Sequence, residues 1–226
     1  LFLNPDAAVF PDTLEKALYA MQSPEYADIA ICGVQLLDDS GQVSRSCARF
    51  PNAVTLLGET IGLHRLSPKR TLLMSDWAHD TTKQVDHVIG AFYLIRKRVF
   101  DELCGFDESF FLYLEDLDLS YRAKLAGCNS LYLADAQAFH KGGGVSDQVK
   151  AKRLFYVLRS RVLYAFKHFN RLSALMVLLA TIIAEPLSRS ALAVARRSWE
   201  DLKNTWQGYG TFLCWLPAWI FKGSTR

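Results

Sequence analysis

The chain changes its residue pattern close to residue 149. Residues 1–149 hold 13 Lys or Arg and 20 Asp or Glu, a net charge of −7, whereas residues 150–226 hold 13 basic and 3 acidic residues, a net charge of +10. Short apolar runs alternate with amphipathic helical patterns in the first part, and helical patterns alone follow. Alternating strands and helices are typical of an α/β fold with a mostly parallel sheet. We therefore expect an α/β domain over residues 1–147 and a basic, apolar helical region over residues 148–226.

The composition limits the classes of protein that this chain can belong to. Half of its 226 residues are hydrophobic, which is enough for a full core and argues against disorder. The five cysteines are scattered, odd in number and without a CxxC pair. A disulfide framework or a zinc cage is therefore not expected, and the pattern favours a reducing, cytoplasmic compartment.

The helical region combines positive charge with long aliphatic stretches. This pattern differs from a nucleic-acid surface, so we expect no nucleic acid and instead an anionic membrane surface. Residues 172–184 carry no charge, but this run is shorter than the ~20 residues that span a bilayer, and Pro186 is expected to end it. Trp215 and Trp219 suit a membrane interface. Packing of these helices on one another or on a partner subunit is the alternative, which leaves oligomerisation open.

Residues 110–122 (FFLYLEDLDLSYR) place three carboxylates directly behind an aromatic run. Burying a carboxylate is costly unless the group is paired or functional. At about 100° per helical residue, Asp118 and Arg122 form an i,i+4 pair, while Asp116 points elsewhere. The ordinary structural explanation is that acidic residues favour the first turn of a helix. The functional alternative is that Asp116 faces a cleft.

Five motifs in sequence order resemble the second half of a family 2 glycosyltransferase, in the bacterial rhamnosyltransferase-like branch. They are LFLNPD (1–6), VDHVIGAFYLIR (85–96), GFDE (105–108), EDLDL (115–119) and HKGGG (140–144). The resemblance covers roughly residues 1–165. It implies a GT-A fold, inverting transfer from a nucleotide-sugar, and a chain in which the nucleotide-binding half of the domain is missing.

The same resemblance implies roles for the two acidic residues of the EDLDL motif. Asp116 would be the general base, and Glu115 the second choice or an acceptor-binding group. Because the surroundings are apolar and aromatic, we expect the pKa of Asp116 to be raised, which would improve it as a base near neutral pH.

A metal and diphosphate site is implied by the motifs at residues 1–6 and 140–144. Asp6 and His140 would hold Mg²⁺ or Mn²⁺, since hard cations prefer carboxylate oxygen. Asn4 and Lys141 would contact the nucleotide-sugar diphosphate. Many relatives carry Asp where this chain has Asn4, so we expect weaker metal binding here. The alternative for His140 is a structural histidine.

The acceptor site is expected to involve Asp86, His87 and Trp77. Asp86 and His87 begin the strand predicted over residues 85–95, which is expected to break at Gly90. Trp77 lies in the weakly patterned segment 51–84, which is expected to form a loop with short helices over the cleft. A solvated strand end is the alternative for Asp86 and His87.

Three functional hypotheses follow. The first is a glycosyltransferase that moves a sugar, with rhamnose as the candidate, from a nucleotide-sugar to a lipid-linked or polysaccharide acceptor, peripheral on the cytoplasmic face of the inner membrane. The second is a non-catalytic, membrane-associated or partner-binding fragment. The third is a metal-dependent hydrolase that uses Asp6, Asp116 and His140.

Overall fold

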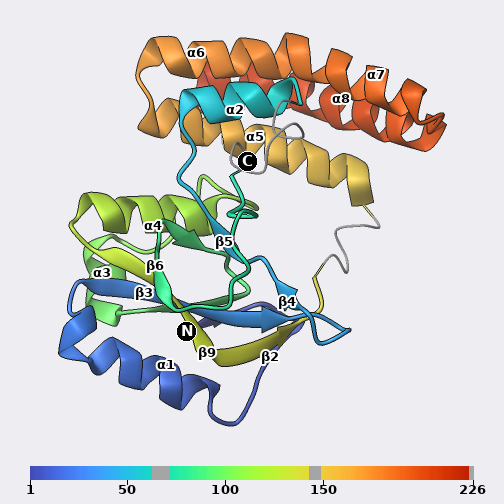
Figure 1. Ribbon diagram of the computed structural model, residues 1–226. Helices are drawn as coiled ribbons and strands as arrows, with labels where there is room; N and C mark the ends of the chain where they lie inside the picture. The colour runs from blue at the N-terminus through green and yellow to red at the C-terminus, as the bar shows by residue number, and fades with distance from the viewer. Residues whose placement is uncertain (63–71, 143–148, 224–226) are drawn as a thin grey trace. The chain divides into compact units, whose positions relative to one another are not determined.

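The computed structural model describes residues 1–62, 72–142 and 149–223, which form two compact units (Figure 1). The first unit comprises residues 1–50, 72–107 and 116–142, and the second comprises residues 51–62, 108–115 and 149–223. Two segments that precede residue 147 thus belong with the C-terminal helices. The predicted short helix within residues 51–84 is present as α2 (Ala53–Thr60), and residues 63–71 lie outside the described part.

A mixed sheet forms the centre of the first unit, and the predicted α/β class is confirmed. Its strands lie in the order β1 (Phe2–Leu3), β8 (Phe92–Ile95), β3 (Ile29–Leu37), β9 (Asn129–His140) and β2 (Ala7–Val9). The two long strands, β3 and β9, are parallel, whereas the short strands beside them are antiparallel. The edge strands β4 (Val43–Ser44) and β6 (Lys83–Val85) pair with β3 and β9.

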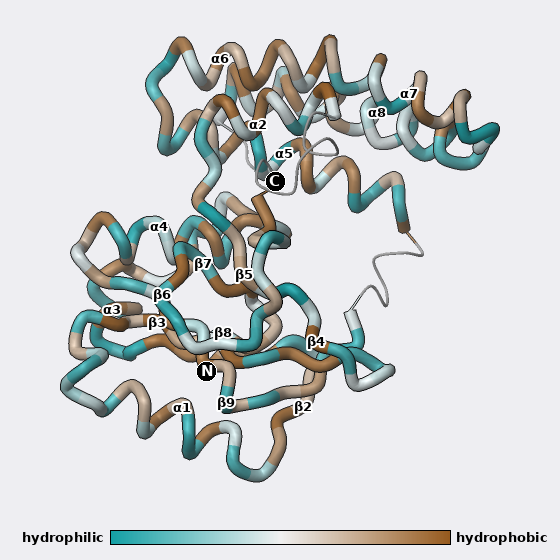
Figure 2. The backbone as a smooth tube through the Cα atoms, in the orientation of Figure 1, coloured by the Kyte–Doolittle hydropathy of each residue, from teal (hydrophilic) through white to brown (hydrophobic). Residues whose placement is uncertain are grey.

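The central strand β3 is buried along almost its whole length. A strand covered on both faces reads as a continuous apolar run, which is the pattern of this segment. On one face α1 (Thr13–Gln22) contributes Ala17 and Met21 to a core with Leu36. On the other face Tyr93 and Leu119 belong to a second core cluster. Figure 2 shows hydrophobic residues concentrated along β3.

The segment predicted as one strand over residues 85–95 is three strands in the structure. β6 pairs with β9, β7 (His87–Val88) pairs with β5 (Cys47–Ala48) in a separate two-stranded sheet, and β8 joins β3. The predicted break at Gly90 is confirmed, since β7 ends at Val88 and β8 begins at Phe92, but the prediction of one strand before this break was wrong, because the pairing partner also changes at Asp86. Gly33 permits the close approach of β7, since a Cβ there would lie 2.6 Å from Cβ of Val88.

Left-handed residues follow two helices of the first unit. Cys104 and Gly105, with φ of 57° and 70°, follow α3 (Lys97–Glu102), and Gly127, with φ 82°, follows α4 (Glu115–Leu125). Both glycines adopt the left-handed conformation that terminates helices and that other residues adopt at a cost.

The second unit is helical. Beside α2 it contains α5 (Lys150–His168), α6 (Arg171–Leu179), α7 (Glu185–Ala195) and α8 (Trp199–Lys222). The expected break at Pro186 is wrong, because a π-helical segment, Ala180–Ala184, joins α6 to α7 in one 25-residue helix. Pro186 lies inside this helix, directly after the π-helical segment, whose i→i+5 hydrogen bonding departs from the α-helical pattern that a proline interrupts. Within the described residues, this is the helix long and apolar enough to cross a membrane, by length and composition alone.

Charged side chains are buried inside the second unit. Arg161 on α5 pairs with Glu185 on α7, and Arg189 contacts the other carboxylate oxygen of Glu185 at 2.8 Å. The segment that leads into α4 is held by α5, since the Ser160 hydroxyl donates to the Leu112 carbonyl over 2.7 Å. In Figure 2 hydrophobic and hydrophilic stretches alternate along α6 and α7.

Candidate active site

Asp116 lies in the first turn of α4, and three groups hold its carboxylate. Oδ1 accepts the N–H of Leu117 at 2.8 Å, and Oδ2 accepts the N–H of Gly90 at 2.7 Å from the loop between β7 and β8. Nε2 of His87 lies 3.6 Å from Oδ2. The side chain is 20% exposed, so the carboxylate is mostly buried and still accessible to solvent.

The pKa of Asp116 is lower than its ordinary value of 3.8. Burial raises this pKa, but the attraction of the His87 imidazole 3.6 Å away and the hydrogen bonds from Gly90 and Leu117 outweigh burial. The expectation of a raised pKa was wrong, because these local partners stabilise the charged form more than the apolar surroundings destabilise it. Asp116 is therefore ionised at neutral pH, the form that can accept a proton.

A second layer of polar groups supports this carboxylate. The His87 side chain is 3% exposed, and its Nδ1 lies 2.9 Å from the Ser120 hydroxyl. That hydroxyl lies 3.0 Å from the hydroxyl of Tyr93, which also donates to the backbone carbonyl of Asp116 at 3.5 Å. Burial raises the pKa of Tyr93, which keeps its hydroxyl protonated.

The sequence analysis missed both hydroxyl groups of this layer. Ser120 follows Asp116 by four residues, and this helical spacing would have placed the two side chains on one face of α4. Tyr93 offered no comparable signal, because only the tertiary fold brings β8 against α4.

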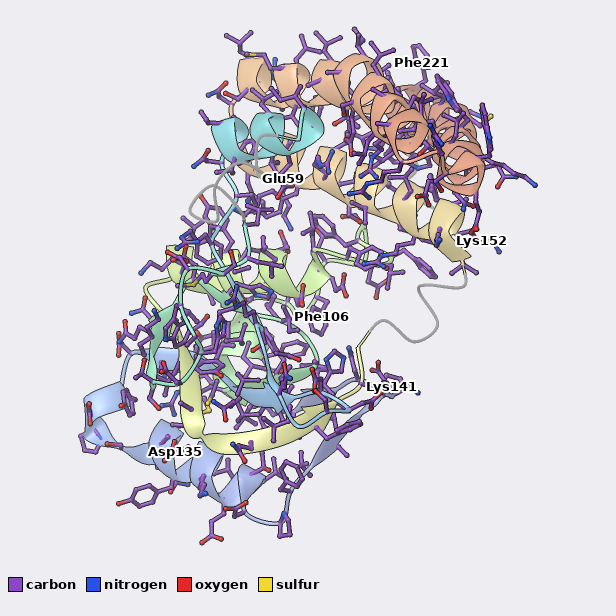
Figure 3. The ribbon with its side chains drawn as sticks, turned by 45° about the vertical axis from the view of Figure 1, so that its right-hand side comes forward. Glu59, Phe106, Asp135, Lys141, Lys152 and Phe221 are labelled. Carbon is purple, nitrogen blue, oxygen red and sulfur yellow. The ribbon has the colours of Figure 1, made fainter. Side chains whose placement is uncertain are left out.

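Asp6 and His140, the two predicted metal ligands, lie together in the structure. β2 pairs with the end of β9, which places Ala7 opposite His140. The Lys141 N–H donates to the Asp6 carbonyl over 3.1 Å, and Nε2 of His140 lies 3.5 Å from Oδ1 of Asp6. Figure 3 shows Lys141 where β9 ends.

These two side chains fit a divalent cation that also binds a substrate. Two adjacent ligands about 2.1 Å from one octahedral ion lie roughly 3 Å apart, close to the observed 3.5 Å between His140 and Asp6. In the part of the chain that the structure describes, no group of three or more His, Cys, Asp or Glu side chains could hold a metal. A cation at this pair would therefore take its other ligands from substrate phosphates and water, as Mg²⁺ commonly does.

One backbone hydrogen bond joins the segment before Asp6 to the segment beside Asp116. The Asn4 N–H donates to the Ala91 carbonyl at 3.1 Å, and Ala91 follows the glycine that binds Asp116. Asn4 and Lys141 are both exposed, as contact with a diphosphate would require, and that role remains a prediction. Asp6, Asp116 and His140 all lie in the first unit, and their meeting around one site stays a prediction.

The predicted acceptor residues Asp86 and His87 occupy different environments. Asp86 is exposed and accepts the N–H of Phe50 at 3.0 Å, which stabilises the β5–β7 region. His87 is buried beneath the Asp116 carboxylate, so it does not have the surface position expected of an acceptor ligand. The acceptor role of Asp86 remains a prediction.

Trp77 is half-buried and already engaged with neighbouring side chains. Its ring stacks on His79 with centroids 4.1 Å apart, and Nζ of Lys83 lies 3.7 Å from the ring centroid. The indole N–H faces the Thr81 hydroxyl at 3.2 Å. Stacking of a sugar on this ring would require Lys83 or His79 to move.

The remaining carboxylates of the EDLDL motif differ in role. Asp118 is fully buried and accepts from Nε of Arg122 at 2.8 Å, which confirms the predicted i,i+4 pair and makes Asp118 structural. Glu115 is the first residue of α4 and is half-buried. Tyr113 and Leu114, which precede it, both have φ of 66°. Left-handed conformations at non-glycine residues cost about 1–3 kcal/mol each and occur often at functional sites.

A family model described as "Glycosyl transferase family group 2" matches residues 1–221. The chain belongs to this family. The transferase class and the family expected from its motifs are therefore confirmed.

Named relatives of this glycosyltransferase chain are similar at modest identity. The rhamnosyltransferase WbbL of Escherichia coli K12 is 28% identical over 77% of the chain and 66% of its own length. An N-acetylglucosaminyl-diphospho-decaprenol L-rhamnosyltransferase of Mycobacterium tuberculosis is 26% identical over 61% of the chain and 45% of its own length. A hexosyltransferase of Haloferax volcanii, Agl10, is 28% identical over 57% and 38%. The chain thus spans two thirds or less of the relatives that it matches.

Proposed function

We propose that this glycosyltransferase chain transfers a sugar, with rhamnose as the candidate, from a nucleotide-sugar to a lipid-linked or polysaccharide acceptor with inversion at the anomeric carbon. The names of two relatives, both rhamnosyltransferases, support the choice of sugar, and one of these names specifies a diphospho-decaprenol substrate. The observation that carries the proposal is the Asp116 carboxylate, which is ionised, oriented by two N–H groups and partly exposed.

Asp116 acts as the general base in the proposed reaction. Its Oδ2 accepts the Gly90 N–H and faces His87, whereas Oδ1 accepts one hydrogen bond from the described residues, that of the Leu117 N–H. This carboxylate takes the proton of the acceptor hydroxyl while the hydroxyl oxygen attacks the anomeric carbon. The bond from that carbon to the diphosphate oxygen breaks, and its electron pair leaves with the nucleoside diphosphate. Attack opposite the leaving group inverts the configuration without a covalent enzyme intermediate.

Asp6 and His140 would hold a Mg²⁺ or Mn²⁺ ion together with the diphosphate. When bound, the cation would supply charge stabilisation to the departing diphosphate. Lys141 follows His140 and contributes a second positive charge on the exposed end of β9.

The second unit has an apolar surface suited to an anionic membrane. Exposed apolar residues form a row along the helix Arg171–Ala195. They are Leu172, Leu175, Met176, Leu179, Ile183, Leu187 and Val194. Residues 150–226 carry a net charge of +10, which attracts anionic headgroups. We therefore place the protein peripherally on the cytoplasmic face of the inner membrane, where a lipid-linked acceptor is accessible. A partner subunit that covers the same row is the alternative.

The test is a transfer assay with dTDP-rhamnose, Mn²⁺ and an N-acetylglucosaminyl-diphospho-lipid, with the product identified by mass spectrometry. We expect the native protein to transfer the sugar and Asp116→Asn to lose this activity. Donor binding, measured by calorimetry, should be retained in the variant. Glu115→Gln serves as the neighbouring control and should retain more activity. A chain that binds neither donor nor acceptor would instead be the non-catalytic fragment, and full activity of Asp116→Asn would refute the base assignment.

A further inference from the structure

His87 is a buried titratable group that takes no direct part in the proposed transfer. Its two ring nitrogens face two different partners: Nδ1 lies 2.9 Å from the Ser120 hydroxyl, and Nε2 lies 3.6 Å from Oδ2 of Asp116. With 3% of its side chain exposed, the imidazole cannot reach a substrate in bulk solvent. A histidine so placed acts on the carboxylate or only on packing.

We propose that His87 is a positioning residue, which orients the Asp116 carboxylate and keeps it ionised through a hydrogen-bonded chain that runs from Tyr93 through Ser120 to the imidazole. This inference rests on the proposed role of Asp116 as the base. No substrate contact is assigned to His87 itself.

The two hydroxyl groups let Nε2–H point toward Asp116 in either protonation state of the ring. When the imidazole is neutral, Tyr93 donates to Ser120, and Ser120 donates to Nδ1 of His87, so that the ring proton resides on Nε2. When the imidazole is charged, Nδ1–H donates to Ser120, Ser120 donates to Tyr93, and Tyr93 donates to the Asp116 carbonyl, which is 3.5 Å away. Hydroxyl groups can reverse in this way because each is both donor and acceptor.

The other charged groups near these hydrogen-bonded residues have partners of their own. On α4, Asp118 is neutralised by Arg122, which also donates to the carbonyls of Leu103 and Gly105. On β8 the nearby titratable group is the protonated Tyr93. Asp86, adjacent in sequence, is exposed and accepts a backbone N–H, which screens its charge.

Among the described residues, removal of the imidazole would leave the N–H groups of Gly90 and Leu117 as the hydrogen-bond donors to the Asp116 carboxylate. The carboxylate would remain mostly buried, and burial disfavours its charged form. The pKa of Asp116 should then rise, and the carboxylate should lose its orientation.

The test measures the pKa of Asp116 directly, by ¹³C NMR titration of side-chain carboxyl groups in Asp-labelled chain. The Asp116 signal is assigned by its loss in Asp116→Asn. We expect the titration midpoint to move to higher pH in His87→Ala and to move less in His87→Gln, whose amide can still donate. The matched control is His79→Gln, since His79 is a fully buried histidine with other partners in the same unit. This control should leave the midpoint unchanged.

The pH dependence of transfer provides the second measurement. The acid limb of kcat/KM should move to higher pH with the NMR midpoint, with a loss of about ten-fold or more at its acid end and recovery at higher pH.

An unchanged Asp116 midpoint in folded His87 variants would overturn the inference. If neither His87 variant folds, Ser120→Ala carries the test, because it releases Nδ1 and should also raise the midpoint, and no change there would overturn it. Full activity of Asp116→Asn would instead refute the proposed base, whatever the midpoint.

Discussion

The backbone N–H of Gly90 donates to Oδ2 of Asp116 over 2.7 Å, and a Cβ at position 90 would lie 3.0 Å from the same oxygen. This contact is closer than nine in ten Cβ contacts, so the carboxylate must shift to make room. We expect Gly90→Ala to lower kcat by about ten- to a hundred-fold, because a small misplacement of a catalytic group is costly. Steady-state kinetics would measure the loss.

Gly210→Ala is the matched control for that substitution. A Cβ at Gly210 on α8 meets nothing within 4 Å, so this change should leave kcat unaltered and stabilise the helix by up to about 1 kcal/mol. Unchanged kcat in Gly90→Ala would show that the close approach does not position the base.

Stability should depend on the charge of Asp116 at acid pH. The folded-state pKa is lowered from 3.8, so the ionised carboxylate stabilises the native state above the unfolded-state pKa, and this contribution is lost as the pH falls through the folded-state pKa. In urea unfolding, the free energy of unfolding of the native protein should therefore exceed that of Asp116→Asn at pH 7, and this difference should shrink below about pH 4. An advantage that stays constant across this range would contradict the lowered pKa.

The Asp118–Arg122 pair should matter for folding. Asp118 is fully buried, and Arg122 donates both to its carboxylate and to the Gly105 carbonyl. Asp118→Ala should lower the free energy of unfolding by about 3–5 kcal/mol, because an arginine charge is left without its partner. Chemical denaturation measures this loss. The control is Lys97→Ala, which breaks the exposed pair with Asp101 and should cost at most about 1 kcal/mol.

Metal affinity should depend on the Asp6–His140 pair. Replacing either residue with alanine should weaken Mn²⁺ binding by about ten-fold or more, as measured by electron paramagnetic resonance in the presence of the nucleoside diphosphate. Asp12→Ala removes an exposed carboxylate that pairs with Lys16 and should not change the affinity. Equal affinity in all three variants would eliminate this pair as the metal site.

Membrane binding should depend on the exposed apolar row of the second unit. Leu179→Glu and Ile183→Glu place charges on that row and should reduce co-flotation with vesicles that contain anionic lipid. Leu18→Glu is the control, since Leu18 on α1 is 48% exposed, similar to the 47% of Leu179. If both substituted proteins still float with the vesicles and a dimer dissociates instead, a partner subunit is favoured over lipid.

Local features of the fold were predictable from the sequence. The end of α4 at Gly127 and the Asp118–Arg122 pair depend on residues at most a few positions apart, where helical geometry alone decides which groups meet. The family motifs also identified Asp6 and His140, whose proximity follows from the pairing of β2 with β9. The helix through Pro186 was not predictable, because the propensity of a proline to end a helix does not anticipate a π-helical segment.

The sequence by itself predicted which groups would carry the chemistry: a carboxylate at position 116 and a carboxylate–imidazole pair at positions 6 and 140. The tertiary structure alone decided the state of the first of these groups. Apolar neighbours in sequence predicted a raised pKa for Asp116, whereas the fold brings His87 and Gly90 against its carboxylate and lowers that pKa. The physical reason is that electrostatic energies depend on distances between groups, and these distances are set by packing between β7, β8 and α4 rather than by order along the chain.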